Sequence, residues 1–120
     1  MTVLKHGNRG ITSKSGGADV LEELGVPIDL PVPALRECVL ENGAGFLFAP
    51  LYHPAFKAVV PVRKALAEEG IRTVFNLIGP LLNPGRPYYH LVGVFDSVFT
   101  SPFAYILVRL GRKRAWAFHG

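Results

Sequence analysis

Short apolar runs alternate with segments of helical periodicity along the first two thirds of the chain. Apolar residues recur at helical spacing in three segments, and each of these segments ends at a glycine or just before one. The pattern predicts helices over residues 18–24, 34–42 and 54–70. Pro61 lies inside the third segment and is expected to kink or break it, because proline removes a helical hydrogen bond. The apolar runs between the helices predict strands at residues 3–4, turning at Gly7, and at residues 46–49.

The last third of the chain repeats this alternation. The apolar segment 73–82 is interrupted by Gly79 and Pro80, and residues 83–85 (Asn-Pro-Gly) are typical of a tight turn. Ser101 and Pro102 have the residue types of an N-cap and a first helical position, which predicts a helix from there to Gly111. Strands are predicted on either side of that helix, over residues 90–95 and 114–118.

Helices alternating with short apolar strands are typical of an α/β fold with a mostly parallel sheet flanked by helices. At 120 residues the chain fits one domain or part of one. It starts within a strand and stops at the end of another, where α/β proteins place ligand loops. Residues 1–120 are therefore expected to form part of a larger α/β domain.

Composition and charge exclude several classes of protein. The chain is 49% hydrophobic and 18% charged, which favours a globular interior over disorder. No apolar run approaches the roughly 20 residues of a membrane helix, so a cytoplasmic protein without membrane contact is expected. Cys38 is the single cysteine and is expected to be a small buried hydrophobe. The four histidines are scattered without metal-ligand spacing, so no metal site is predicted within the chain.

The net charge of +4 raises the question of nucleic-acid binding. The first basic cluster is interleaved with glycine, asparagine, serine and threonine rather than exposed aromatics, which favours a small phosphorylated ligand over a polymer. It consists of Lys5, Arg9 and Lys14. The second cluster lies at a predicted helix end, where cations complement the helix dipole. It consists of Arg109, Arg112, Lys113 and Arg114. Nucleic acid is thus not the expected partner.

The segment between residues 5 and 17 has the composition of an anion-binding loop. A strand leads into residues 5–10 (Lys-His-Gly-Asn-Arg-Gly), and residues 12–17 (Thr-Ser-Lys-Ser-Gly-Gly) enter a helix. Glycines let backbone N–H groups approach phosphate oxygens, and a helix N-terminus adds partial positive charge. A basic turn with a glycine-rich helix cap explains the same residues equally well, since glycine-rich loops are common.

Several segments in the same order resemble the anthranilate phosphoribosyltransferases. The segments KHGNR, SKSG and ADVLE come first, followed by FLFAP, HPAFK, VRK and RTVFNLIGPLLNP; they occupy residues 5–9, 13–16, 18–22, 46–50, 53–57, 62–64 and 72–84. Together they cover nearly the whole chain. The resemblance implies transfer of a phosphoribosyl group from phosphoribosyl pyrophosphate (PRPP) to the amine of anthranilate, in tryptophan biosynthesis.

The resemblance also implies the roles of individual residues. The expected PRPP-binding residues are Lys5, His6, Gly7, Asn8, Arg9, Gly10, Ile11, Thr12, Ser13 and Gly17. The expected anthranilate-binding residues are Asn8, His53 and Arg63, with Arg63 pairing the carboxylate. His6 fits a ligand contact and a packed turn histidine equally well, and His53 fits a wall of the anthranilate site and a helix cap equally well. No residue of the chain is expected to act as a catalytic acid or base.

The chain also departs from the family pattern. The family's upstream Gly-Thr-Gly-Gly-Asp loop, its downstream Asp-Glu pair for Mg²⁺ and most of its helical dimerisation domain have no counterpart here. We therefore expect the Mg²⁺ ligands to lie outside this chain, the complete protein to be a homodimer, and the chain alone to be inactive. Position 17 is glycine where the family commonly has serine or another small residue, and Phe56 replaces a usual methionine.

Three alternatives accompany this interpretation. A pyrimidine nucleoside phosphorylase also uses a glycine- and serine-rich anion loop, although its sequence differs after the lysine. A paralogue that lost anthranilate specificity and binds nucleic acid would show a long basic face and binding that depends steeply on salt. A non-functional fragment could retain the middle of the fold alone.

Overall fold

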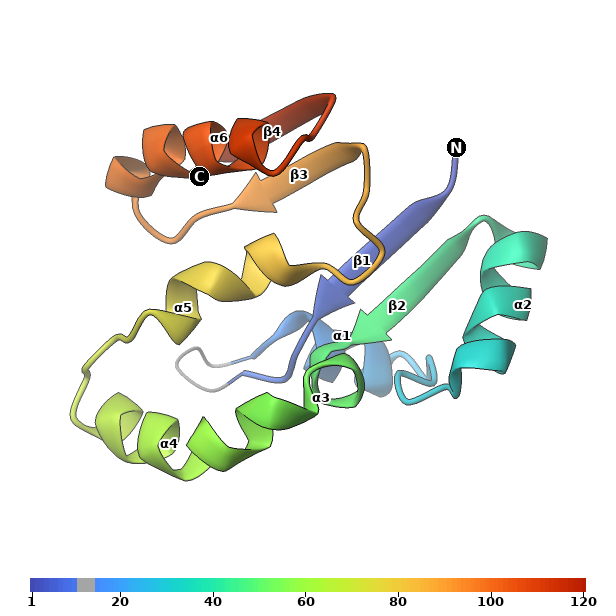
Figure 1. Cartoon of the computed structure of the whole chain (residues 1–120). Helices are drawn as coiled ribbons and strands as arrows, with labels where there is room; N and C mark the ends of the chain where they lie inside the picture. Colours follow the sequence, from blue (N-terminus) through green and yellow to red (C-terminus); the bar gives the residue numbers. More distant parts are fainter. Residues whose placement is uncertain (11–14) are drawn as a thin grey trace. The chain divides into compact units, whose positions relative to one another are not determined.

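The computed structural model describes residues 1–10 and 15–120, and these form two compact units, residues 1–79 and 80–120. Each unit is a small parallel β-sheet with helices, which confirms the predicted α/β class (Figure 1). The strands of the described residues form two separate two-stranded sheets, a division that no sequence pattern indicated. The prediction of a single partial domain over residues 1–120 stays a prediction.

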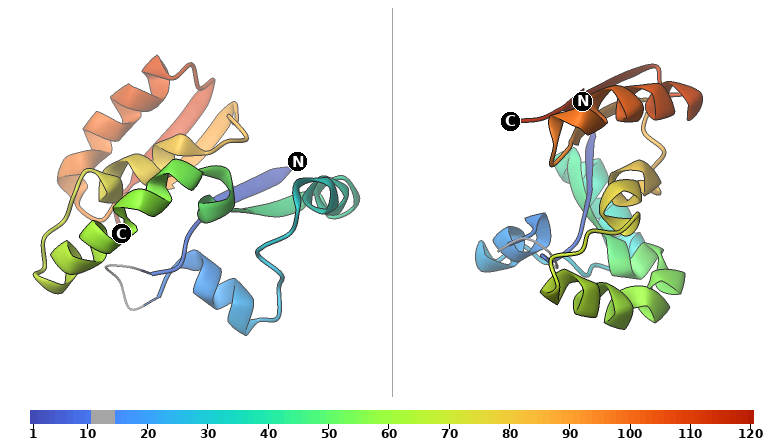
Figure 2. Two further views of the ribbon diagram at one scale, coloured as in Figure 1. Left: turned by 60° about the horizontal axis from the view of Figure 1, so that its bottom comes forward. Right: turned by 90° about the vertical axis from the view of Figure 1, so that its left-hand side faces the viewer.

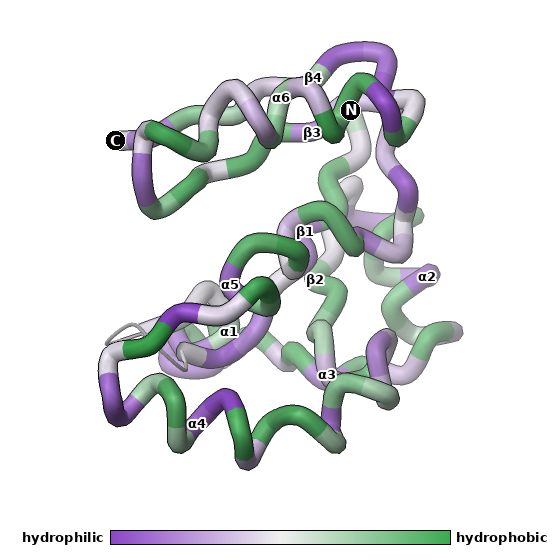
Figure 3. The backbone as a smooth tube through the Cα atoms, turned by 60° about the vertical axis from the view of Figure 1, so that its left-hand side comes forward, coloured by the Kyte–Doolittle hydropathy of each residue, from purple (hydrophilic) through white to green (hydrophobic). Residues whose placement is uncertain are grey.

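The first unit is built on strands β1 (Val3–Gly7) and β2 (Ala44–Phe48), which pair in parallel so that Gly7 lies opposite Phe48 (Figure 1). A parallel pair requires a crossover, and helices α1 (Gly17–Glu23) and α2 (Val32–Asn42) supply it. Three consecutive residues of β2 are buried, as expected for a parallel strand covered on both faces. Figure 3 shows a hydrophobic stretch of backbone at β2. Phe46 and Phe48 pack with Ala18 of α1 and with Ile28.

Gly45 makes the close packing of α2 on β2 possible. A Cβ atom at this position would lie 2.4 Å from Val39 Cγ2 and 2.9 Å from Leu35 Cδ1. Both side chains belong to α2, and Leu35 is buried. Gly43 ends α2 with φ 71°, the left-handed conformation that favours glycine. The predicted helix at 34–42 is therefore confirmed, although it begins two residues earlier.

After β2 the chain forms a series of short helices. They are α3 (Ala49–Tyr52), the 3₁₀ helix η1 (Pro54–Val59), α4 (Val60–Glu68), α5 (Phe75–Ile78) and the 3₁₀ helix η2 (Gly79–Leu82). The predicted break in the helix over residues 54–70 is confirmed. It falls between Val59 and Val60, so that Pro61 lies in the first turn of α4, where its missing N–H is tolerated. The short helix α3 was not predicted.

The second unit contains strands β3 (Tyr89–Gly93) and β4 (Arg114–Phe118), which are again parallel (Figure 2). The chain that connects them forms a 3₁₀ helix η3 (Ser97–Phe99) and helix α6 (Thr100–Arg109). Phe103 and Leu107 of α6 are buried. Gly111 has φ 74° and ends the helical region as predicted. The expected N-cap at Ser101 is wrong, because Ser101 lies inside α6; Asp96 caps η3 instead by accepting from Val98 N at 3.0 Å.

Candidate functional site

The residues expected to bind ligands begin on strand β1 and continue beyond its end. Lys5, His6 and Gly7 are the last residues of the strand, and Asn8 follows directly. On the neighbouring strand, β2 ends at Phe48 and leads through α3 to His53. Parallel strands bring their carboxyl ends to one edge of the sheet, where α/β proteins place ligand loops. The two segments therefore leave the sheet at the same edge.

Helix α1 holds the backbone at Gly10 and at Gly16. The Oδ2 atom of Asp19 accepts hydrogen bonds from Gly10 N at 2.8 Å and from Gly16 N at 2.6 Å. Ala18 N donates to Asn8 O at 3.3 Å. These hydrogen bonds to backbone N–H groups lower the pKa of Asp19 below its ordinary value. Asp19 thus caps the start of its own helix at Gly16, which fits the glycine-rich helix cap that the sequence left open beside an anion-binding loop.

Arg9 is exposed, and its guanidinium contacts other residues of the protein. Its Nε and Nη2 atoms donate to the two carboxylate oxygens of Glu22, at 2.9 and 2.6 Å. Its Cζ atom also lies 4.7 Å from the centre of the Phe48 ring. The hydrogen bonds raise the pKa of Arg9 and lower the pKa of Glu22. Arg9 thus has three contacts inside the protein that the sequence did not indicate.

Lys5 contrasts with Arg9. No hydrogen bond or ion pair engages its side chain among the described residues, and the residue is exposed. A Cβ atom at Gly17 would lie 3.2 Å from Lys5 Cε and 3.7 Å from Lys5 Nζ. The Lys5 ammonium therefore lies across the start of α1, next to the position where this chain has glycine. Its charge is available to an anion.

A row of ring contacts runs from the end of β1 to helix α4. The rings of His6 and His53 meet edge to face, with centroids 5.2 Å apart. His53 stacks on Phe56 at 5.5 Å, and Phe56 meets the edge of Phe75 at 5.3 Å. Arg63 completes the row, with its Cζ 5.5 Å from the centre of the Phe75 ring. The structure therefore connects His6, His53 and Arg63, which the sequence analysis had singled out separately.

Arg63 is half-buried, and its charge is not balanced by a neighbouring acid. Burial lowers its pKa, and among the described residues no carboxylate pairs with it and no hydrogen bond engages its guanidinium. A guanidinium that is partly removed from water and lacks a counter-ion is costly unless a ligand supplies the charge. Arg63 is thus suited to binding an anion.

His53 also has a polar atom without a partner among the described residues. Its Nε2 atom is buried and has no hydrogen-bond partner in the described part of the chain. His53 occupies the N-cap position of η1, but its side chain makes no capping hydrogen bond there to any described residue. Of the two roles that the sequence left open, the cap is therefore not used here. Buried polar atoms are usually satisfied, so His53 Nε2 is left with a hydrogen bond that a ligand or a water molecule can supply.

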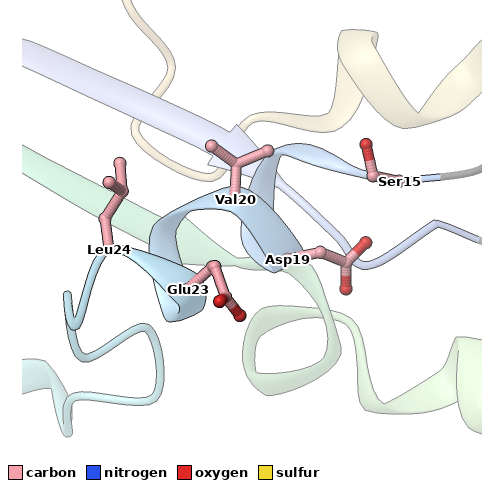
Figure 4. A pocket seen from close by; sticks show the side chains of 5 residues that line it. All are labelled: Ser15, Asp19, Val20, Glu23 and Leu24. Carbon is pink, nitrogen blue, oxygen red and sulfur yellow. The ribbon is translucent and has the colours of Figure 1, made fainter.

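Two hollows lie in the first unit. One, of about 290 Å³, is lined by Gly10 together with Lys64, Ala67 and Glu68, and so lies between the glycine-rich segment and α4. The other, of about 380 Å³, lies along α1 and is lined by Ser15, Asp19, Val20, Glu23 and Leu24 (Figure 4). Gly10 belongs to the expected PRPP-binding residues, and the other residues that line the first hollow do not. The second lies among residues that carry none of the expected ligand contacts.

Three of the expected PRPP-binding residues, Ile11, Thr12 and Ser13, lie outside the described residues. Asn8 is half-buried, and its Oδ1 accepts from Arg9 N at 2.8 Å.

Within residues 1–10 and 15–120, no three histidine, cysteine or acidic side chains gather as metal ligands. No helix within those ranges is long and apolar enough to cross a membrane.

The sequence analysis missed Asp19, Glu22 and Phe75 as parts of this region. Asp19 could have been found, because an acidic residue three positions after a helix N-cap is half of a capping box. Glu22 lies 13 residues from Arg9, and Phe75 lies 12 residues from Arg63. No local pattern connects residues at such separations.

Comparisons with known proteins agree with this geometry. The family profile described as "Glycosyl transferase family, a/b domain" matches residues 1–120. The chain belongs to this glycosyl transferase family. It is 53% identical over 118 residues to the anthranilate phosphoribosyltransferase of Azorhizobium caulinodans, covering 98% of this chain and 33% of that protein. It is 50% identical to the enzyme of Methanosarcina barkeri, covering 98% of this chain and 31% of that protein.

A solved structure shows the same fold. The crystal structure of anthranilate phosphoribosyltransferase from Thermus thermophilus matches with a TM-score of 0.83 and 50% sequence identity. The match covers 100% of this chain and 35% of that chain. The resemblance to the anthranilate phosphoribosyltransferases is thereby confirmed. The chain spans about a third of the length of these members of the glycosyl transferase family.

Proposed function

We propose that a full-length protein carrying this chain transfers the phosphoribosyl group of PRPP to anthranilate. The anthranilate nitrogen forms a bond to the anomeric carbon of the ribose while the bond from that carbon to pyrophosphate breaks, and the nitrogen releases a proton. The relatives that match at about half identity are named for this activity. The observation that carries the proposal is the half-buried guanidinium of Arg63, which no described acid neutralises and which ring contacts link to His53.

The described residues support a division of labour between two substrates. Lys5 presents an ammonium that no described residue pairs, at the end of β1, which suits the phosphates of PRPP. Arg63 has the planar donors that grip a carboxylate bidentately, and anthranilate has one carboxylate. His53 Nε2 has no hydrogen-bond partner among the described residues, and ring contacts link His53 to Arg63, which suits a role on the anthranilate side. The protein's main contribution is then to hold two substrates in reacting geometry.

The transition state requires stabilisation of charge on the departing pyrophosphate. Lys5 supplies one positive charge for this purpose, and preorganised donors act strongly at such sites. Mg²⁺ would supply further neutralisation of the pyrophosphate, and we propose that its ligands lie outside the described residues. Aromatic amines are usable nucleophiles, so the mechanism uses no protein base from this chain. We further propose a cytoplasmic homodimer acting in tryptophan biosynthesis.

Substitution of Arg63 in the full-length protein tests the proposal. Loss of a charge-assisted hydrogen-bonding partner is worth about 1.5–3 kcal/mol, so Arg63→Ala should raise KM for anthranilate roughly 10- to 100-fold and leave KM for PRPP near its original value. Arg63→Lys keeps the charge without the planar donors, so its KM for anthranilate should lie between that of the unchanged protein and that of Arg63→Ala. Anthranilate fluorescence provides the assay. Equal losses toward both substrates would make Arg63 structural and defeat the proposal.

The chain by itself gives a second test. These 120 residues should bind PRPP weakly and show no measurable transfer, because we place the metal ligands elsewhere. Isothermal titration with PRPP and Mg²⁺ measures the binding, and anthranilate fluorescence measures turnover. Robust turnover by the 120-residue chain would contradict the proposed division of the site.

A further inference from the structure

Arg9 lies in the middle of the run that is expected to bind PRPP, yet it pairs at the surface with another residue of the chain: its side chain is 50% exposed and that of Glu22 is 40% exposed. A bidentate pair with Glu22 uses two of its nitrogens, and Phe48 lies under its guanidinium at 4.7 Å. Bidentate pairing of arginine with carboxylate fixes both partners in one geometry. The pKa directions agree, since the pKa of Arg9 is raised and that of Glu22 is lowered, mainly by their mutual hydrogen bonds. The edge of the guanidinium formed by Nε and Nη2 is occupied by Glu22, so a phosphate could take that bidentate edge only if Arg9 left the pair.

Asp19 acts on the same segment from the same helix. It lies three residues before Glu22 on α1, and residues at this spacing are neighbours on a helix surface. Its single Oδ2 atom accepts from the backbone N–H groups of Gly10 and Gly16. Figure 4 shows its carboxylate directed away from the axis of α1. Two acidic residues of one helix therefore fasten the backbone that follows β1.

The close approach of Gly16 shows how tightly this backbone is held. A Cβ atom at Gly16 would lie 2.4 Å from Asn8 O and 2.6 Å from Gly10 N. The segment that enters α1 thus lies directly against the segment that leaves β1. Ala18 N reinforces the contact by donating to Asn8 O. Asn8 belongs to this held segment, which continues directly from the strand that carries Lys5.

We propose that Arg9, Glu22 and Asp19 form a clasp that positions Lys5 and Asn8 for PRPP, and that Arg9 is a positioning residue rather than a phosphate ligand. This inference rests on the proposed function, because it concerns the PRPP side of the same site. Within the run, the two cations have different tasks. Lys5 meets the phosphate charge, and Arg9 holds the backbone that presents Lys5 and Asn8.

A double-mutant cycle in the full-length protein separates a positioning residue from a ligand. Arg9→Gln and Glu22→Gln each break the same pair, so each should raise KM for PRPP by about tenfold, and the double variant should be no worse than either one. KM for anthranilate should change less than about twofold. A ligand role predicts the opposite for Glu22→Gln, which would release Arg9 toward phosphate. An unchanged or lower KM for PRPP in that variant overturns the proposal.

Two further substitutions keep the test informative if a variant folds poorly. Arg9→Lys keeps the charge but cannot form the bidentate pair, so the clasp predicts a raised KM for PRPP, whereas a point-charge ligand predicts little change. Asp19→Asn keeps an acceptor oxygen for Gly10 and Gly16, while Asp19→Ala removes it. The alanine variant should therefore raise KM for PRPP clearly more than the asparagine variant; equal effects of the two contradict the role of Asp19.

Lys5→Ala distinguishes failure of this inference from failure of the proposed function. If Lys5→Ala raises KM for PRPP and the Arg9 and Glu22 variants do not, the clasp is wrong and the PRPP site stands. If the Lys5 variant and the clasp variants all leave KM for PRPP unchanged, the PRPP site itself has been misplaced and both are overturned.

Discussion

The guanidinium of Arg63 lies over the ring of Phe75, with its Cζ 5.5 Å from the ring centre. Arg63 belongs to α4 and Phe75 to α5, so this contact fixes the side chain of one helix against the next. The face of an aromatic ring attracts a cation without neutralising its charge. Phe75 can therefore hold Arg63 in place while the guanidinium edge stays open to a carboxylate.

Phe75→Leu should weaken anthranilate use selectively. A cation–π contact contributes about 0.5–1 kcal/mol, so KM for anthranilate should rise roughly two- to fivefold, with KM for PRPP unchanged. Phe75→Tyr keeps a ring face, so its KM for anthranilate should stay close to that of the unchanged protein. Steady-state kinetics of the two full-length variants provide the measurement. If the leucine variant raised both KM values equally, Phe75 would act on the fold and not on Arg63.

Gly17→Ser should improve PRPP binding. A Cβ at this position would lie 3.2 Å from Lys5 Cε, which is the far end of a flexible side chain and can shift. The serine hydroxyl then adds a donor beside the Lys5 ammonium, and one hydrogen bond is worth about 0.5–1.5 kcal/mol, so KM for PRPP should fall roughly two- to tenfold. Gly17→Ala adds the Cβ without the hydroxyl and is the matched control. A higher KM for PRPP in both variants would mean that Lys5 cannot move.

Much of the fold could be predicted from local chemistry. Several predicted helix ends fall at glycines with positive φ, namely Gly25 (75°), Gly43 (71°), Gly70 (73°) and Gly111 (74°), because this conformation strains other residues. The turn at residues 83–85 is also confirmed, with Asn83 Oδ1 accepting from Gly85 N at 2.9 Å. These features depend on neighbours in sequence. A single sequence carries such information directly.

The candidate site could be predicted only in part, because its contacts join distant residues. The resemblance indicated Lys5, His53 and Arg63 without showing what holds them. The contact between His6 and His53 requires the parallel pairing of β1 with β2, which brings residues 47 positions apart together. Likewise, Arg9 has the residue type of a phosphate ligand, and the fold places it against Glu22. Residue type alone could not distinguish a phosphate ligand from an arginine that pairs with a glutamate of the same chain.

The stability of the chain should fall in mildly acidic solution because of His90. Burial, and then the charge of Arg112, lowers the pKa of His90 below its ordinary value near 6.5, despite a hydrogen bond with the Pro80 backbone. Below that ordinary value the unfolded chain takes up a proton that the folded chain resists. The free energy of unfolding is therefore highest above about pH 6.5 and decreases as pH falls toward the lowered pKa.

Urea unfolding of the chain between about pH 5 and 8, which brackets the ordinary histidine pKa, measures this dependence. His90→Gln should remove the contribution of His90 to the slope, and Arg112→Gln should reduce it, because the second cause of the shift is then absent. A slope that is unchanged in His90→Gln would assign the acid sensitivity to other groups.

Gly16→Ala should destabilise the first unit strongly. Its Cβ would lie 2.4 Å from Asn8 O and 2.6 Å from Gly10 N, and these are backbone atoms that cannot rotate away. Overpacking of this kind costs about 1–3 kcal/mol, and we expect the upper half of that range because the segments are also hydrogen-bonded to Asp19. Gly93→Ala is the matched control, since its Cβ would lie at an ordinary van der Waals distance, 3.6 Å, from Phe118 Cζ. Urea unfolding should show the loss in Gly16→Ala alone; a change below about 0.5 kcal/mol there would mean that the two segments are not held together in solution.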